Sequence, residues 1–145
     1  MVTPTQKTLV QETWASIAPI ADDAAQLFYR RLFELDPSLR AMFPGEMTEQ
    51  RRKLMNMIGA AVRGLDRLEQ LVPVVQDLGR RHAGYGVADR HYDTVGAALL
   101  WTLEKGLGDA FTPEVKDAWA TVYGLLASTM QAAAAEAARA TLVTV

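Results

Sequence analysis

Residues 71–87 read LVPVVQDLGRRHAGYGV, and this stretch decides how the rest of the chain is interpreted. The apolar residues Leu71, Val75 and Leu78 recur at steps of four and three, as on one face of an α-helix, and His82 continues this face four residues later. Proline is tolerated in the first turn of a helix, so we expect Pro73 to lie there. Gly84 is the kind of residue that ends a helix. The spacing therefore predicts a helix with His82 on its apolar face.

Similar spacing recurs on both sides of this stretch, in segments separated by Pro or Gly. Thr3-Pro4 and Thr112-Pro113 each put a capping hydroxyl before a proline at the first helical position. No run of alternating apolar and polar residues competes as a strand. We expect an all-α domain of six or seven helices. The other predicted buried faces are Leu9, Trp14 and Ile17; Ala25, Phe28, Tyr29, Leu32 and Phe33; Leu54, Met57, Ile58, Ala61 and Leu65; Tyr92, Val95, Gly96, Leu99, Leu100 and Leu103; and Trp119, Val122, Leu126 and Met130.

Composition narrows the class of protein. The 145 residues suit one domain, and a formal net charge of −2 excludes a basic nucleic-acid footprint. The absence of cysteine excludes disulfides and thiolate metal sites. Residues 118–135 lack charge, but their small and polar residues favour a buried helix over a membrane span. The N-terminal residues 1–7 are polar and no apolar run follows them, which predicts a cytoplasmic protein without a secretion signal. The alanine-rich residues 132–145 are expected to form an extended or frayed tail.

The chain has two histidines, so a site that needs several imidazole ligands is excluded. His82 has two interpretations: a core residue bonded to a carbonyl, or a single axial ligand to a haem in an apolar slot. Aromatic and branched residues from several segments could line such a slot or belong to the core: Phe43, Leu54, Leu78, Val87 and Tyr92. His91 lies beside Arg90 in a predicted corner without a partner histidine, so we expect an exposed side chain and no second metal. Tyr85 is expected to be a surface or packing residue.

Several blocks of sequence stand in a recognisable order between Leu9 and Gln131. They are Leu32 to Pro37, Met42-Phe43, Arg52 to Met55, Leu78 to His82 with Gly86-Val87, Tyr92 to Gly96, Leu103 to Pro113, and Ala118-Trp119 with Tyr123-Gly124. Through these blocks and their order, the chain resembles the globins, in particular the neuroglobin-like and flavohaemoglobin-type single-domain bacterial haemoglobins. The resemblance implies one globin domain over residues 1–145, with six to eight helices around a haem pocket.

The resemblance also implies roles for single residues. His82 becomes the proximal iron ligand, and Phe43 the ring that wedges the haem. Tyr29, Gln50 and Leu54 become the distal residues, although the polar run from Glu49 leaves the register at Gln50 open by one position. Lys53 is a partner for a haem propionate or part of a solvated face. The haem is type b, because a chain without cysteine cannot form thioether links. Leu78, Val87 and Tyr92 complete the implied haem contacts.

These roles imply reversible binding of oxygen, nitric oxide, carbon monoxide or a similar ligand. A diatomic ligand that draws charge from ferrous iron is stabilised by donors such as Tyr29 and Gln50, so high oxygen affinity is expected. Neuroglobins usually have histidine where this chain has Gln50, which makes internal six-coordination doubtful. The alternative is a nitric oxide dioxygenase with an external reductase, although flavohaemoglobins have a glutamate at the position of Ala134. A different class remains open: a haem-free helical interaction module.

Overall fold

The computed structural model describes residues 2–144, with side chains up to Arg139. This part of the chain contains six α-helices, three short 3₁₀ helices and no strand. The all-α prediction is therefore confirmed. The elements are α1 Pro4–Ile17, η1 Ala18–Ile20, α2 Ala21–Leu35, η2 Pro37–Met42, α3 Thr48–Gly64, α4 Leu68–Gly84, α5 Asp89–Leu107, η3 Gly108–Ala110 and α6 Pro113–Thr144.

The two predicted Thr-Pro helix starts are confirmed. Thr3 precedes α1, and its hydroxyl accepts a hydrogen bond from the backbone N–H of Gln6 at 3.1 Å, while the Gln6 side chain accepts one from the backbone of Thr3 at 3.0 Å. At α6, the Thr112 hydroxyl accepts from the backbone N–H of Val115 at 3.2 Å. Both caps satisfy N–H groups that have no partner inside a helix.

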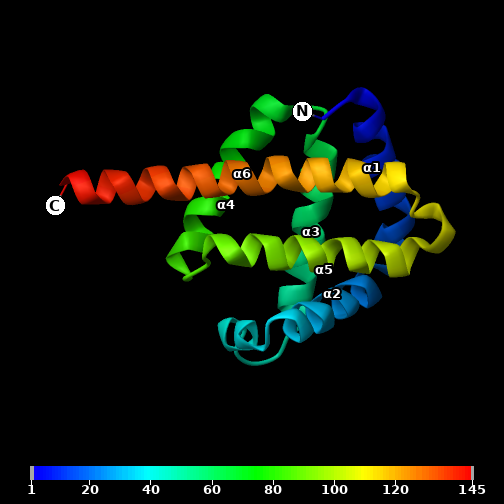
Figure 1. Cartoon of the computed structure of the whole chain (residues 1–145), viewed down its shortest axis with the longest axis horizontal. Helices are drawn as coiled ribbons and strands as arrows, with labels where there is room; N and C mark the ends of the chain where they lie inside the picture. Colours follow the sequence, from blue (N-terminus) through cyan, green and yellow to red (C-terminus); the bar gives the residue numbers. More distant parts are fainter. Residues whose placement is uncertain (1, 145) are drawn as a thin grey trace.

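The helices cross rather than form a parallel bundle. Figure 1 shows α5 and α6 running side by side, with α3 crossing behind them and α2 at the lower edge. The most extensive contact between two helices joins α4 to α6. The C-terminal part of α6 extends past the other elements (Figure 1). Among the described residues, no helix combines the length and apolarity that crossing a membrane requires.

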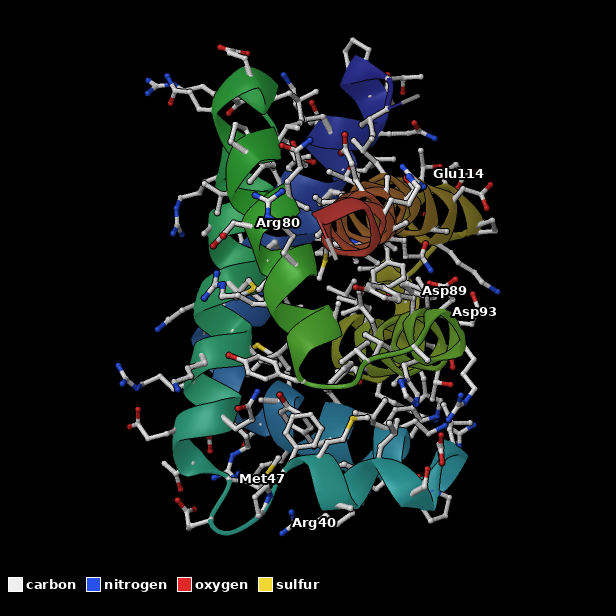
Figure 2. All side chains as sticks on the ribbon, turned by 90° about the vertical axis from the view of Figure 1, so that its left-hand side faces the viewer. Arg40, Met47, Arg80, Asp89, Asp93 and Glu114 are labelled. Atoms are coloured by element: carbon white, nitrogen blue, oxygen red, sulfur yellow. The ribbon has the colours of Figure 1, made fainter. Side chains whose placement is uncertain are left out.

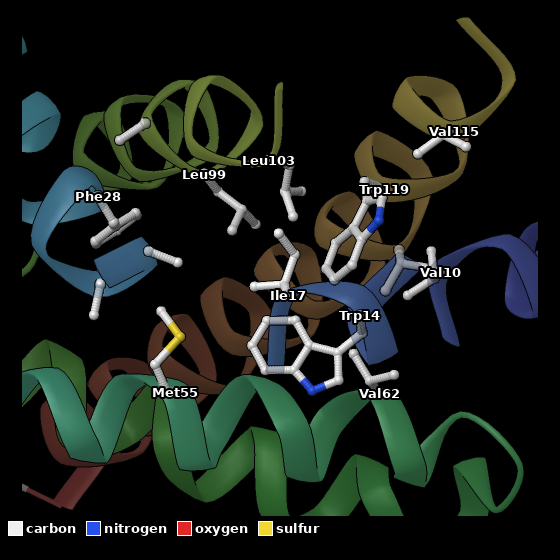
Figure 3. Close-up of a cluster of buried hydrophobic side chains, with 14 of the residues drawn as sticks. Val10, Trp14, Ile17, Phe28, Met55, Val62, Leu99, Leu103, Val115 and Trp119 are labelled. Atoms are coloured by element: carbon white, nitrogen blue, oxygen red, sulfur yellow. The ribbon is translucent and has the colours of Figure 1, made fainter. Parts of the chain in front are cut away.

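The main core lies where α1, α2, α5 and α6 meet. It includes Ile17, Leu103 and Trp119, which are at most 2% exposed (Figure 3). The rings of Trp14 and Trp119 are 6.2 Å apart between centroids. The indole N–H of Trp119 donates to the hydroxyl of Thr13 at 2.8 Å, which satisfies a polar group that the core would otherwise leave unpaired. A second, smaller cluster consists of Leu71, Val75 and Met130 and joins α4 to α6.

The predicted buried face of α3 is partly wrong. Leu65 is buried as expected, but Met57 is 40% exposed, and the buried residues on α3 itself are Met55, Gly59 and Val62. The reason is a close helix contact: a side chain on Gly59 would lie 3.4 Å from the indole nitrogen of Trp14. The small residue, and not the largest apolar ones, sets which face of α3 meets α1.

The predicted place of Pro73 in the first turn of its helix is also wrong. Helix α4 begins at Leu68, which puts Pro73 in the second turn. The earlier start is possible because the backbone carbonyl of Arg67 accepts hydrogen bonds from the N–H groups of Gln70 and Leu71, both at 3.0 Å. Pro73 itself has no N–H to donate, so this turn has one helical bond fewer.

Candidate functional site

Tyr29 on α2 and Gln50 on α3 form a direct polar contact. The side-chain Nε2 of Gln50 donates to the hydroxyl oxygen of Tyr29 at 3.1 Å. Tyr29 is only 6% exposed, and its burial raises the pKa of the phenol, with the hydrogen bond from Gln50 partly opposing the rise. Tyr29 is therefore protonated at neutral pH. Because its oxygen accepts from Gln50, its own proton can be donated to another group.

Aromatic rings surround this pair. Phe43 directly follows η2 and meets the ring of Tyr29 edge to face, with 5.4 Å between centroids. Phe33 lies 5.8 Å from Phe43. Leu54 is half-buried one helical turn after Gln50, whereas Lys53 is exposed. The structure thus brings Tyr29, Gln50 and Phe43 together, with Leu54 on the same helix.

His82 lies near the end of α4, and one of its nitrogens is already occupied. Its Nδ1 is 2.9 Å from the carbonyl oxygen of Leu78, one turn earlier. A carbonyl can only accept, so the proton resides on Nδ1 and leaves Nε2 with a free lone pair. Burial lowers the pKa of His82, although its bond to Leu78 partly opposes this. The side chain is therefore a neutral imidazole, the form that binds a metal.

The turn after α4 fixes the surroundings of His82. The backbone N–H of Val87 donates to the carbonyl of His82 at 3.1 Å. Gly86 has a φ of 88°, a conformation that favours glycine. Val87 and Tyr92 are half-buried. Leu78 and Tyr92 both pack against the smaller core cluster, so the structure brings these two predicted residues together.

Tyr123 on α6 is a residue to which the sequence analysis assigned no role. Its hydroxyl donates to the backbone carbonyl of Tyr92 at 2.6 Å, and burial raises its pKa. This bond ties the start of α5 to α6. The sequence carried one signal, since a buried tyrosine usually finds a partner for its hydroxyl. The position of that partner could not be read from spacing, because the two residues are on different helices.

The prediction that His91 is exposed is wrong. The residue is 4% exposed, and its Nδ1 accepts a hydrogen bond from the backbone N–H of Ala88 at 2.8 Å. His91 is the third residue of α5, and from this position a side chain can fold back to the residue before the helix. Its role in the structure is to cap α5. Tyr85 is exposed, as predicted.

The donor set fits a haem better than a metal held by the protein alone. Among the described residues, no group of three or more His, Asp or Glu side chains could hold a metal ion. Instead, α4 offers one neutral imidazole nitrogen, and α2 and α3 offer a pair of hydrogen-bond donors. In Figure 2, α3 lies at the left, α4 in front and α5 at the right, with α2 in the lower part of the view. A haem needs one axial nitrogen from the protein and apolar or aromatic contacts for its macrocycle.

Comparison with known proteins agrees with this geometry. The family model described as "Globin" matches residues 26–130. Neuroglobin of Danio rerio is 33% identical over 138 aligned positions, and the alignment covers 86% of this chain and 87% of that protein. Flavohemoprotein of Bacillus subtilis (strain 168) is 37% identical over 105 aligned positions that cover 69% of this chain. Flavohemoprotein of Rhizobium meliloti (strain 1021) is 35% identical over 130 aligned positions that cover 88% of this chain. The chain spans 26% and 32% of these two flavohemoproteins. It therefore belongs to the globin family, which implies a haem cofactor and small diatomic ligands.

Proposed function

We propose that this protein reversibly binds oxygen and other diatomic ligands with high affinity at a haem b. The observation that carries the proposal is the 3.1 Å hydrogen bond from Gln50 to Tyr29. It joins the two side chains best suited to stabilise charge on a bound ligand, and it holds the phenol of Tyr29 with its proton free to be donated.

The residues described above would hold the cofactor. His82 would supply its Nε2 as the axial ligand, and the carbonyl of Leu78 would keep the ring in the correct tautomer. Lys53, which is exposed, would reach a propionate at the haem edge. Haem iron, when bound, supplies the coordination bond to the diatomic ligand. The residues in contact with the macrocycle would be Phe43, Leu54, Leu78, Val87 and Tyr92.

The protein contributes orientation and electrostatics. A ligand that accumulates negative charge is stabilised by donors that are already in place, because they need not reorganise when the charge develops. Gln50 fixes the phenol of Tyr29, and the phenol proton is left for the ligand. Because Tyr29 is almost completely buried, water competes little for this proton, which strengthens the hydrogen bond. Slow ligand release follows from this arrangement.

Replacing Tyr29 with phenylalanine is expected to speed oxygen release by about 10- to 150-fold, since a hydrogen bond to a charged group contributes roughly 1.5–3 kcal/mol. Gln50→Leu should also speed release. The double variant should fall short of the product of the two effects, because the two residues share one hydrogen bond. Stopped-flow oxygen dissociation measures all three, with Tyr85→Phe as an exposed control. Unchanged release in both single variants would refute the distal assignment.

A second candidate function is nitric oxide dioxygenation, favoured by the same Tyr29–Gln50 pair and by the similarity to flavohemoproteins. In this reaction nitric oxide, oxygen and one electron give nitrate, and a bound ferrous haem would supply the electron. A reductase must return the electron, and we infer an external one. Helix α6 does not supply the carboxylate that flavohaemoglobins place near the residue corresponding to His82. Ala134 stands at the position of that glutamate, and Glu136 is exposed.

Mixing the ferrous, oxygen-equilibrated protein with nitric oxide is expected to yield about one nitrate per haem and then stop. Addition of a flavin reductase with its nicotinamide cofactor should restore continuous turnover. Nitrate analysis combined with the visible spectrum follows both stages. A failure to form nitrate in the first turnover would eliminate the enzymatic candidate and leave ligand binding unaffected. A preparation that stays colourless when haem is supplied would instead favour a haem-free interaction module.

A further inference from the structure

Gln50 lies in the first turn of α3, where a helix is held least firmly by its own hydrogen bonds. Met47, which precedes the helix, gives it no side-chain cap, and Figure 2 labels this residue at the lower end of α3. The backbone N–H of Arg51 donates to the carbonyl of Met47 at 2.9 Å. The first buried residue of the helix is Met55. The place of Gln50 therefore depends on contacts that the first turn makes with other elements.

Arg51, the residue after Gln50, makes such a contact with Asp22 on α2. Its Nε donates to Oδ1 of Asp22 at 3.1 Å, and the other carboxylate oxygen accepts from Nε2 of Gln26 at 2.8 Å. The Gln26 and Arg51 hydrogen bonds lower the pKa of Asp22, so its carboxylate is charged at neutral pH. The Arg51 side chain is only 21% exposed, which is less than any other partner in the ion pairs of the described residues.

This ion pair and the Tyr29–Gln50 hydrogen bond join the same two helices. Asp22, Gln26 and Tyr29 follow one another at steps of four and three, so they lie on one face of α2. Gln50 and Arg51 are consecutive in α3, and both bind this face. Among the described residues, no other ion pair joins α2 to α3: three lie within single helices, and one joins α1 to the turn after α3. The first turn of α3 is therefore attached to α2 at two adjacent positions.

A second carboxylate acts on Arg51 from the segment before α3. Glu46 accepts hydrogen bonds from the backbone N–H of Thr48 at 2.9 Å and from the Thr48 hydroxyl. These bonds are the main reason why the pKa of Glu46 is lowered, and the charge of Arg51 contributes to the same shift. The positive charge of Arg51 is therefore attracted both to α2, through Asp22, and to the chain segment that leads into α3. Removing this charge weakens both attractions.

We propose that Asp22 and Arg51 are positioning residues that hold the first turn of α3 against α2 and so keep Gln50 bonded to Tyr29. The inference rests on the proposed function, in which Tyr29 and Gln50 stabilise the bound ligand. Neither charged residue is assigned a contact with the ligand, and both act through Gln50. Without the ion pair, the first turn opens more often, because it loses one of its two polar contacts with α2. Whenever it is open, the ligand lacks the donors held in place by Gln50 and is released faster.

Arg51→Met tests the proposal, because it keeps the apolar stem of the side chain and removes the charge. Oxygen release should become about two- to five-fold faster, the range expected for a partly exposed ion pair. Backbone amide hydrogen exchange at residues 51–53, which can be measured with or without haem, should accelerate by a similar factor. Arg51→Lys should restore most of both effects. Asp23→Asn is the matched control: Asp23 is exposed in the same turn of α2 as Asp22, and it forms no ion pair among the described residues.

Adding Arg51→Met to the Gln50→Leu variant separates positioning from a direct effect of charge. Oxygen release should then change little further, since Arg51 acts through Gln50, whereas hydrogen exchange should still accelerate. Three results would overturn the proposal: unchanged exchange in Arg51→Met, equal effects of Arg51→Met and Asp23→Asn, or a full further effect on oxygen release in the Gln50→Leu background. If the proposed function fails, Tyr29→Phe and Gln50→Leu leave oxygen release unchanged, and hydrogen exchange still shows whether the ion pair holds the first turn of α3.

Discussion

Replacing His82 with glycine is expected to remove most of the haem from the protein, with retention weakened by more than about 100-fold. Loss of a group that only orients a metal ligand already costs 10–100-fold, and this substitution removes the ligand itself. His91 cannot take its place, because its Nδ1 is engaged with the backbone of Ala88 at the start of α5. Haem content and the visible bands of the purified variant measure the effect.

Two further measurements separate ligation from a loss of helix stability. Ala83→Gly places the same residue beside His82 in α4 and controls for the helix penalty of glycine, roughly 1 kcal/mol. It should retain haem. Free imidazole added to the His82→Gly variant should restore the bands, because it can occupy the space of the missing ring. Intact bands in His82→Gly without imidazole would refute the assignment of the axial ligand.

Replacing Gly79 with alanine is expected to lower the free energy of unfolding by about 2 kcal/mol or more. A Cβ at this position would lie 2.3 Å from the carbonyl oxygen of Met130 and 2.5 Å from its Cα, so α4 and α6 would have to separate. Overpacking costs about 1–3 kcal/mol and occasionally more, and backbone atoms cannot escape by changing rotamer. The higher helix propensity of alanine stabilises the variant by at most about 1 kcal/mol, so the net effect of the substitution is destabilising.

Gly84→Ala is the matched control for this prediction. Gly84 ends the same helix, and a Cβ there meets nothing within 4 Å. Its variant should be neutral or slightly more stable. Urea unfolding of both haem-loaded variants provides the comparison, and haem loss from Gly79→Ala should also be faster, since Gly79 lies one turn before His82. Equal stability of the two variants would show that α4 and α6 do not approach as closely as described.

The fold was predictable because its signals are local. Helix periodicity and the Thr-Pro starts depend on residues within a few positions of each other, and both starts were confirmed at Thr3 and Thr112. The exact buried face of α3 was not predictable. This helix has apolar residues on two sides, and periodicity gives no weight to Gly59, whose lack of a side chain lets α3 approach Trp14.

The candidate site was predictable in its residue types but not in its contacts. The sequence indicated Tyr29 and Gln50 through the family resemblance, yet the hydrogen bond between them joins two helices and residues 21 positions apart. The same holds for Tyr123, whose partner is the backbone of Tyr92. Spacing cannot reveal such pairs, since it describes the faces of one helix and not which faces meet.

By itself, the sequence determined the helical class and the position of His82 on an apolar helix face, because both depend on the spacing of residues within one segment. It also determined the globin family, because the matching blocks stand in order along most of the chain. The tertiary structure alone decided that His91 is buried, that Gly79 touches the backbone of α6, and that the indole N–H of Trp119 donates to the hydroxyl of Thr13. Each of these depends on the distance between helices, which is set by the packing of the whole core and not by any one segment.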